Sequence, residues 1–243
     1  MEKTVSDAIR YRRSVRVFKS EEQPSEEAVK ECIENAVLAP TSSNLQLWEF
    51  YHITNKETLK KMTHACLDQN AAKTATQMVV IVTRKDLWKQ RARFNVDELK
   101  AQIGSKPESE YSRREKFAIA YYKKLIPTIY FDFLGIFGWL KFIVFNIIGL
   151  FKPVYRQVRL SDMRIVAHKS AALAAQNFMI SMAAKAYDTC PMEGSDTLKV
   201  KQILNLPRGS EICMVIGCGI RDGNKGIYNE RIRVPFENVY YKI

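Results

Sequence analysis

Several of the common catalytic signatures are missing from this chain. It has no Walker-type phosphate loop, no HExxH zinc motif and no GxSxG nucleophile elbow. Its three histidines, His52, His64 and His168, do not share a metal-ligand spacing. The sequence therefore supports neither a Ser-His-Asp hydrolase nor metal catalysis.

Cysteine pairing signals are also missing. The five cysteines are odd in number, show no CxxC spacing and mostly stand among apolar or small residues: Cys32, Cys66, Cys190, Cys213 and Cys218. Such thiols are typically free and buried. The N-terminus is charged from its second residue and carries no signal-peptide hydrophobic region. We therefore expect a protein of the reducing cytoplasm.

The excess of basic residues is large but dispersed. Lys and Arg number 38 against 26 Asp and Glu, which gives a net charge of +12. This balance suits nucleic acid, an anionic membrane surface or an anionic cofactor. The chain has no run of five basic residues and no Arg/Gly/aromatic repeat, so we do not expect a nucleic-acid partner.

Helical and strand patterns alternate irregularly along the 243 residues, which favours a mixed α+β structure in layers, as one large domain or two small ones. The residue spacing predicts helices from Ser25 to 37, over 56–67 and over 161–187, the last with Ser161-Asp162 as its cap. Strands are expected at 48–53, 78–82 and 212–216, with a strand-prone tail at 236–241. Residues 86–124 are polar and helix-prone, with a break near 104–107.

Gly217-Cys218-Gly219 follows a buried strand and is reminiscent of a dinucleotide fingerprint. The next glycine is Gly223, however, which gives GxGxxxG with no helix after it. We interpret this segment as a turn that ends the strand.

Arginines cluster near both ends of the chain. Arg12, Arg13, Ser14 and Arg16 form one group, and Arg231 and Arg233 form the other. Guanidiniums bind phosphate oxygens through paired, charge-assisted hydrogen bonds, so both clusters suit a phosphomonoester. A solvated basic turn is the simpler interpretation of either cluster alone.

Two loops add polar groups. Residues 40–46 carry three hydroxyls and two side-chain amides, which can bind the carbonyls and N–H of a heteroaromatic ring. Residues 190–194 combine a proline and a glycine, which could direct main-chain N–H groups at a ligand. Each loop alone could be an ordinary turn.

Taken in order, residues 12–16, 39–48, 191–194 and 231–235 closely resemble the FMN-dependent nitroreductase family. The resemblance covers about residues 4–85 and 160–243, and one departure is Gln46-Leu47-Trp48 where relatives often have Gln-Pro-Trp. It implies a single nitroreductase-like α+β domain over 1–243, with a central mixed sheet flanked by helices. The same resemblance implies an intertwined homodimer with two FMN molecules at the interface. No side chain need act as a catalytic residue.

The resemblance also implies roles for particular residues. Arg12, Arg13, Ser14 and Arg16 would meet the ribityl phosphate and the pyrimidine side of the flavin, and Arg231 and Arg233 would complete the phosphate site. Pro40, Thr41, Ser42 and Asn44 would reach the flavin from the other subunit. Gln69 would contact the ring, and the segment Pro191, Met192, Glu193 and Gly194 would present backbone N–H groups to its reactive edge.

The reaction implied is an NAD(P)H:acceptor oxidoreduction by a ping-pong mechanism, with a nitroaromatic or quinone-like acceptor. A reductive dehalogenase of the same superfamily is an alternative, because these enzymes differ mostly in their lids. A non-catalytic, basic membrane-surface protein is a second alternative.

That second alternative depends on the unmatched middle of the chain. From Phe133 to Phe151 the only charged residue is Lys141, and Gly135, Gly138 and Gly149 interrupt the run. A membrane span needs about 20 apolar residues, so this run is borderline. We expect a variable apolar helical insertion at about 105–159. Its part 125–159 is predicted to form a lid over the flavin, with Phe133, Phe137, Trp139 or Phe142 facing the channel, or else to make a peripheral membrane contact.

Overall fold

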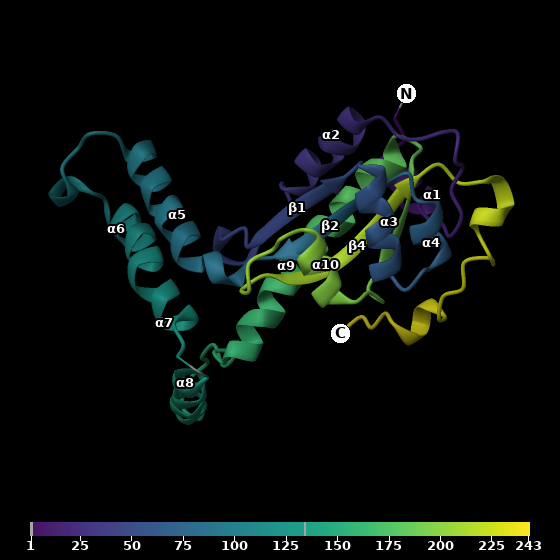
Figure 1. Cartoon of the computed structure of the whole chain (residues 1–243). Helices are drawn as coiled ribbons and strands as arrows, with labels where there is room; N and C mark the ends of the chain where they lie inside the picture. Colours follow the sequence, from purple (N-terminus) through teal and green to yellow (C-terminus); the bar gives the residue numbers. More distant parts are fainter. Residues whose placement is uncertain (1, 134) are drawn as a thin grey trace.

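One sheet lies at the centre of the molecule in the computed structural model, which describes residues 2–133 and 135–243 (Figure 1). Its strands are β1 (Trp48–Ile53), β2 (Gln77–Thr83), β3 (Asp188–Met192) and β4 (Glu211–Gly219), in the order β1-β2-β4-β3. All three ladders are antiparallel. The layered α+β fold is confirmed, but the expected mixed sheet is not, because every neighbouring strand pair runs in opposite directions. The one parallel pairing in the described residues is an isolated bridge between Ser14 and Thr189.

Helices cover both faces of this sheet. The body contains α1 (Val5–Tyr11), α2 (Glu26–Ala36), α3 (Lys56–Ala65), α4 (Asn70–Thr74), α9 (Leu160–Ala184) and α10 (Thr197–Ile203). β2 is buried along its whole length, and its side chains alternate between the faces. Val80 packs with residues of α3, α4 and α10, whereas Val79 and Ile81 pack against α2 and α9. The strand predicted from the apolar run at 78–82 is therefore the centre of both core layers.

The long helix α9 has small residues where it meets its neighbours. Ala171, Ala174 and Ala175 are buried in the cluster that joins α9 to α2 and the sheet. The predicted Ser25 cap of α2 is confirmed, since its Oγ accepts from the N–H of Ala28. The predicted cap of α9 is wrong. The helix begins one residue earlier, with Arg159 as N-cap, because the Asp162 carboxylate accepts from the Arg159 N–H at 3.0 Å.

Three further expectations about strands need correction. Gly217 and Gly219 lie inside β4 rather than in a turn. A Cβ on Gly219 would lie 2.7 Å from the Phe18 ring and one on Gly217 would lie 3.3 Å from Ala71 O, so close neighbours explain why glycines stand in this strand. Pro191 lies inside β3, where it is tolerated because β3 is an edge strand. The tail contains a 3-10 turn, η6 (Phe236–Asn238), instead of a strand, and it runs exposed with no ladder partner.

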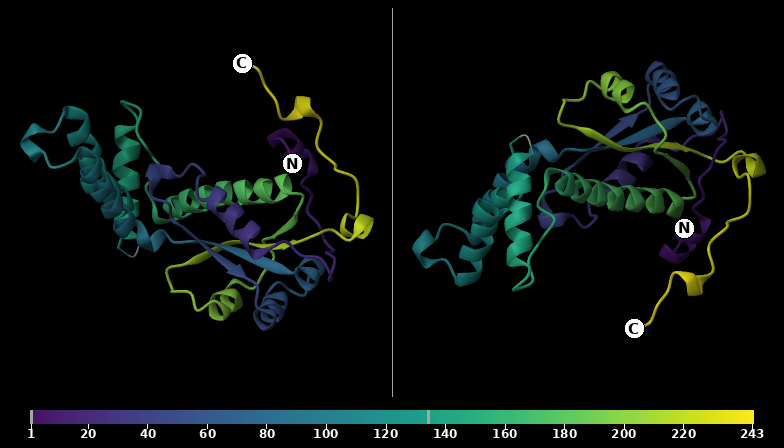
Figure 2. Two further views of the ribbon diagram at one scale, coloured as in Figure 1. Left: turned by 90° about the horizontal axis from the view of Figure 1, so that it is seen from above. Right: turned by 90° about the horizontal axis from the view of Figure 1, so that it is seen from below.

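A helical excursion projects away from the sheet (Figures 1 and 2). It consists of α5 (Trp88–Ile103), α6 (Arg113–Ala120), the π-helical turn η4 (Tyr121–Leu125), α7 (Ile126–Tyr130) and α8 (Ile136–Ile148). The expected break near 104–107 is confirmed, because Gly104 ends α5 with φ +82°. A third apolar cluster, which includes Leu47, Ile126 and Met163, anchors α7 to the body. In the described chain, no helix combines the length and apolar character needed to cross a bilayer.

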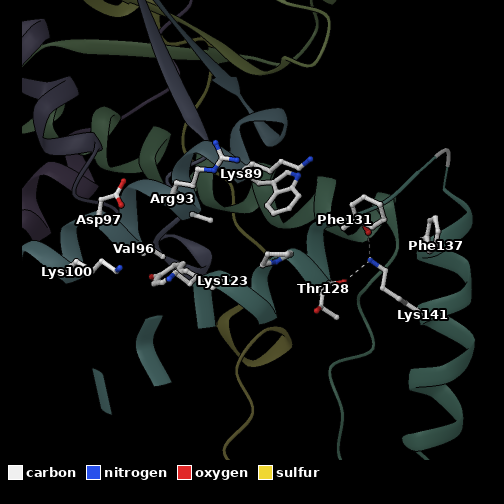
Figure 3. A pocket seen from close by; sticks show the side chains of 14 residues that line it. Lys89, Arg93, Val96, Asp97, Lys100, Lys123, Thr128, Phe131, Phe137 and Lys141 are labelled. Carbon is white, nitrogen blue, oxygen red and sulfur yellow. Dashed lines mark hydrogen bonds between the residues drawn. The ribbon is translucent and has the colours of Figure 1, made fainter. Parts of the chain in front are cut away.

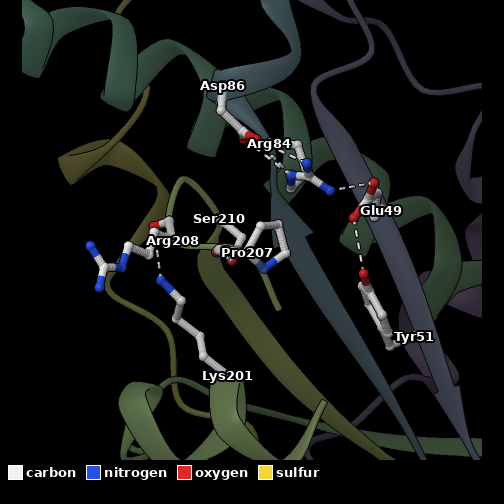
Figure 4. A network of polar contacts seen from close by, with 8 residues as sticks. All are labelled: Glu49, Tyr51, Arg84, Asp86, Lys201, Pro207, Arg208 and Ser210. Atoms are coloured by element: carbon white, nitrogen blue, oxygen red, sulfur yellow. Dashed lines mark hydrogen bonds and ion pairs between the residues drawn. The ribbon is translucent and has the colours of Figure 1, made fainter. Parts of the chain in front are cut away.

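Polar contacts close the edge of the sheet at β1 and β2 (Figure 4). Arg84 lies 2.6 Å from Glu49 and 2.9 Å from Asp86, and Tyr51 donates to Glu49 at 3.1 Å. The hydrogen bonds to Asp86 raise the pKa of the Arg84 guanidinium, although burial acts in the opposite direction. Since every charge in this network has a partner, we interpret it as structural.

The predicted free thiols are confirmed. Four of the five cysteines are buried and Cys213 is half-buried. Burial raises the pKa of Cys32 to about 12 and that of Cys66 to about 11. These thiols therefore stay protonated and have little nucleophilic character at neutral pH.

Candidate functional site

The first arginine cluster is held between β3 and the C-terminal segment. Thr4 caps α1 through the N–H of Asp7. Beyond this helix the Val15 N–H donates to Thr189 O at 3.1 Å, and the Arg16 N–H donates to Gly226 O at 2.7 Å. These bonds place the segment 12–16 against two parts of the chain that lie far away in sequence.

The second cluster is bound directly to the first. Arg231 Nη2 donates to Arg10 O at 3.0 Å and to Arg12 O at 2.5 Å. In return, Arg13 Nη2 donates to Asn229 O. The two ends of the chain thus enclose a cavity of about 280 Å³, lined by Arg12, Arg13, Ser14, Arg16, Ile227, Tyr228, Asn229, Glu230, Arg231, Ile232 and Arg233.

Positive charge dominates this cavity. Within residues 2–133 and 135–243, none of its five guanidiniums forms an ion pair with a carboxylate, and Glu230 is the one acidic lining residue. Burial, together with the charges of Arg231, Arg233 and Arg13, lowers the pKa of Arg12 below its usual value. Like charges held this close are destabilising until an anion compensates them, so the cavity fits a phosphate group.

A second pair of predicted site segments meets at Gln69. Its Nε2 donates to Cys66 O at 3.0 Å and to Gly194 O at 2.7 Å. Both amide hydrogens are used, which leaves the side-chain carbonyl oxygen to meet a ligand. Glu193 and Gly194 are exposed directly after β3, whereas Met192 is buried beneath them.

The polar loop at 40–44 lies elsewhere. The Ser42 N–H donates to Ser170 Oγ in the middle of α9, whereas the N-terminal segment contacts the end of this helix through Ala184 O. Fourteen helical residues separate these contacts, roughly 20 Å at 1.5 Å per residue. A single chain therefore does not bring Pro40, Thr41, Ser42 and Asn44 to the arginine cavity.

This loop is nevertheless held in an unusual conformation. Ser43, Asn44 and Gln46 have φ values of 54°, 47° and 49°. Ser43 Oγ lies 2.7 Å from Tyr121 OH, and Asn44 Nδ2 donates to Asn95 Oδ1 at 3.2 Å. Left-handed backbone at several non-glycine residues is costly and concentrates at functional sites.

The sequence interpretation missed two residues of the arginine cavity. Asn229 accepts from Arg13, and Tyr228 OH accepts from Asn70 Nδ2 at 3.0 Å, which ties the tail to α4. The only sequence feature that could have identified these two residues was their position just before Arg231.

A larger cavity in the excursion was also missed (Figure 3). It measures about 980 Å³ and lies between α5, α7 and α8. Aromatic and cationic side chains line it together, among them Trp88, Tyr122, Phe131, Phe137, Lys89, Arg93, Lys100, Lys123 and Lys141. The signal was the helical spacing of Lys89, Arg93 and Lys100. Of the four aromatic residues expected to face a channel, Phe137 lines this cavity.

The chain is similar in sequence to known proteins. Protein DrgA from Synechocystis is 26% identical over 215 residues, which cover 88% of this chain and 83% of DrgA. MhqN of Bacillus subtilis, named as an NAD(P)H nitroreductase, is 26% identical over 86% of this chain and 84% of its own length.

Solved structures share the fold. YdfN of Bacillus subtilis, named as a nitroreductase, superimposes with a TM-score of 0.73 at 23% identity, covering 98% of each chain. A protein of Exiguobacterium sibiricum, named as a nitroreductase and solved in complex with FMN, gives a TM-score of 0.69 at 17% identity and covers 99% of this chain and 98% of its own.

The family model described as Nitroreductase family matches residues 9–220. This range contains the first arginine cluster, the 40–44 loop, Gln69 and the end of β3, and it includes the excursion that the sequence resemblance left unmatched. By this match the chain belongs to the nitroreductase family.

Proposed function

We propose that this protein is an FMN-dependent oxidoreductase that takes electrons from NAD(P)H and passes them to an electron-poor acceptor, such as a nitroaromatic or a quinone. The observation that carries the proposal is the arginine cavity, in which five guanidiniums from both ends of the chain converge and none has a carboxylate partner among the described residues. FMN would supply the hydride and electron transfer in both half-reactions of a ping-pong cycle.

The chain's own residues would bind and orient the cofactor. Arg12, Arg231 and Arg233 would hold the terminal phosphate, with Arg13, Ser14 and Arg16 beside them. FMN fits better than FAD because a closed guanidinium cage suits a phosphomonoester. Gln69, fixed by its bond to Gly194 O, would offer its carbonyl oxygen to an N–H of the ring. Pro191, Met192, Glu193 and Gly194 would form the adjacent wall.

A homodimer would complete the site. Pro40, Thr41, Ser42 and Asn44 lie by the middle of α9, roughly 20 Å along this helix from the point where the N-terminal segment contacts it, so we infer that they would reach a flavin across a subunit interface. The exposed apolar tail supports such an interface, because Ile232, Val234, Phe236 and Tyr241 are all more than 60% exposed in the single chain. The family relationship supports the same arrangement.

The variable excursion at about 105–159 would set the choice of acceptor. Its cavity exposes aromatic faces beside cationic side chains, which suits a flat, electron-poor and partly anionic molecule. A halogenated phenol would share this chemistry, so reductive dehalogenation belongs in the same assay.

The test is a visible absorption spectrum of the purified, reconstituted protein, followed by heat release of the cofactor. We expect flavin bands, free FMN in the supernatant, and oxidation of NADH or NADPH that depends on a nitroaromatic or quinone. A protein that stays colourless after incubation with FMN, or one that releases FAD, would overturn the proposal.

A further inference from the structure

Helix α8 and the residues that follow it present an apolar face to the outside of the molecule. Ile136, Leu140, Ile143, Val144 and Ile147 recur at helical spacing, and each is between 52% and 56% exposed. Leu150 and Phe151 extend this outer face past the end of the helix. A helix at the surface of a soluble domain normally turns such side chains toward the core. The apolar side chains of α8 point the opposite way, toward the outside.

The polar groups of α8 lie on the opposite side. Lys141 Nζ donates to Thr128 O, Ile129 O and Phe131 O at 3.2, 2.8 and 2.8 Å, as Figure 3 shows for the first and last of these carbonyls. An ammonium group has three donors, and all three are used within the protein. The single charge of the segment is therefore withdrawn from the outer face.

Asn146 and the backbone at both ends of α8 also have hydrogen-bond partners within the protein. Asn146 donates to Phe142 O at 2.8 Å and accepts from Arg156, which also donates to Gly149 O at 2.7 Å. At the other end, the Gly138 N–H donates to Asp132 Oδ1 at 3.2 Å. A helix that enters an apolar medium has to satisfy its polar groups in this way, whereas a helix in water does not.

The position of α8 leaves its outer face free of the rest of the chain. The helix lies beside the start of α9, whereas the turn between α5 and α6 forms the outer tip of the excursion (Figures 1 and 2). A Cβ on Gly138 would lie 3.2 Å from the backbone of Arg159. The Arg159 guanidinium stacks at 4.7 Å on the Phe142 ring, also on the inner side.

Charge around the face identifies its partner. Between residues 117 and 161 the chain has six basic residues, Lys123, Lys124, Lys141, Lys152, Arg156 and Arg159, and one acidic residue, Asp132. Lys123, Lys124, Lys152 and Arg156 are exposed, whereas Asp132 is turned toward the start of α8. An apolar face with basic flanks and an exposed Trp139 is complementary to the surface of an anionic bilayer.

We propose that the outer face of α8, with Leu150 and Phe151, inserts into the interface of an anionic lipid bilayer, so that the protein is a peripheral membrane protein. A second copy of the chain is less well matched, since the basic flanks would meet the same charges across a twofold axis. The helix has 13 residues and reaches about 20 Å, so it would lie in the interface rather than span the bilayer.

The test uses the full-length protein and co-sedimentation with vesicles of phosphatidylcholine alone or mixed with phosphatidylserine. We expect binding to the anionic vesicles that weakens as salt is raised from 0.1 to 0.5 M, about as for other polybasic surfaces. The double variant I143Q/I147Q should reduce the partition coefficient about tenfold or more. The control L67Q/L198Q replaces two leucines on the body that are even more exposed than Ile143 and Ile147, and it should leave binding unchanged.

A second readout places the contact at α8. In anionic vesicles that contain brominated phosphatidylcholine, wild-type fluorescence should be quenched, and W139F should lose most of that quenching. Trp48 is buried and serves as an internal reference.

Three outcomes would overturn the proposal. The first is no vesicle binding, and the second is equal binding by wild type and I143Q/I147Q. The third is a shift of I143Q/I147Q from dimer to monomer in sedimentation without any vesicle binding, which would assign the face to a second copy of the chain.

Discussion

The side-chain amide of Gln69 donates a hydrogen bond of 2.7 Å to the carbonyl oxygen of Gly194, 125 residues further along the chain. The bond joins the N-terminus of α4 to the exposed turn after β3. Gln69 and the segment 191–194, which the family resemblance predicted separately as flavin contacts, therefore lie side by side. A similar relationship holds for Arg231 and Arg12 O, which joins the two ends of the chain.

We predict that Arg12→Ala weakens FMN binding more than Arg233→Ala does. Arg12 is half-buried and Arg233 is exposed, and loss of a charge-assisted bond from a partly buried site costs about 1.5–3 kcal/mol, or roughly ten- to a hundredfold in affinity. Fluorescence titration of the apoprotein with FMN measures both values. Lys225→Ala, which removes an exposed charge outside the cavity, is the matched control.

For the stability of the same variant we do not expect a loss, although its FMN binding should weaken. Because burial and the charges of neighbouring arginines both disfavour the charged form of Arg12, Arg12→Ala should leave the melting temperature of the apoprotein unchanged or raise it. A clear fall in that temperature would mean that Arg12 supports the fold rather than the ligand.

We predict that Gly226→Ala disturbs the arginine cavity through the backbone. A Cβ at this position would lie 2.7 Å from Val17 O and 3.0 Å from Val15 Cγ1, in the segment that carries Arg16. Overpacking of this kind typically costs about 1–3 kcal/mol, so both the melting temperature and the FMN affinity should fall. Gly194→Ala is the comparison, because its Cβ would meet only Gln69 Nε2, at 3.6 Å. Equal melting temperatures for the two variants would contradict this account.

A pH-dependent contribution is expected at the start of α9. The hydrogen bond from Arg159 lowers the pKa of the Asp162 carboxyl, although burial acts against it. A lowered folded-state pKa means that the contribution is complete above the unfolded value near 4 and is lost as the pH falls through the folded value. Asp162→Asn should therefore lower stability by about 1 kcal/mol at pH 7, measured by urea unfolding. The difference from wild type should shrink below pH 4, and a difference that stays constant down to pH 2 would refute the ionic explanation.

Most elements of the fold could be predicted from local sequence patterns. The run Met78–Val82 identified the central strand, and Ser25 identified the start of α2, because each signal depends on residues close in sequence. Gly217 and Gly219 were misassigned because the reason for them is tertiary: Ala75 and Phe18 approach the strand from distant segments. Strand direction was missed for a similar reason, since no local pattern encodes the pairing of β2 with β4.

The candidate site was predictable only as far as residue chemistry and family resemblance reach. Arginine clusters at both ends indicated a shared anion, and the structure brings them together. The direction in which α8 turns its apolar face could not be predicted, because the run from Phe133 to Phe151 is apolar on nearly all sides. The hydrogen bonds of Lys141 to the end of α7 fix the orientation of α8 and therefore the direction of its apolar face.

The last prediction concerns the C-terminal tail. The Phe236 and Tyr240 rings stack at 4.9 Å, yet the whole tail from Asn229 onward is exposed in a single chain. Exposed aromatic residues on an extended arm are best explained by burial on a partner subunit. The variant F236S/Y240S should therefore raise the dimer dissociation constant at least about tenfold, since buried aromatic side chains are typically the strongest contributors to an interface. Sedimentation equilibrium measures this value, with E237Q/K242Q as a control that changes only the charges of the same arm. FMN should be lost in parallel with the dimer, because the 40–44 loop would complete the site from the other subunit. A double variant that remains fully dimeric and retains its flavin would show that the arm lies outside the interface.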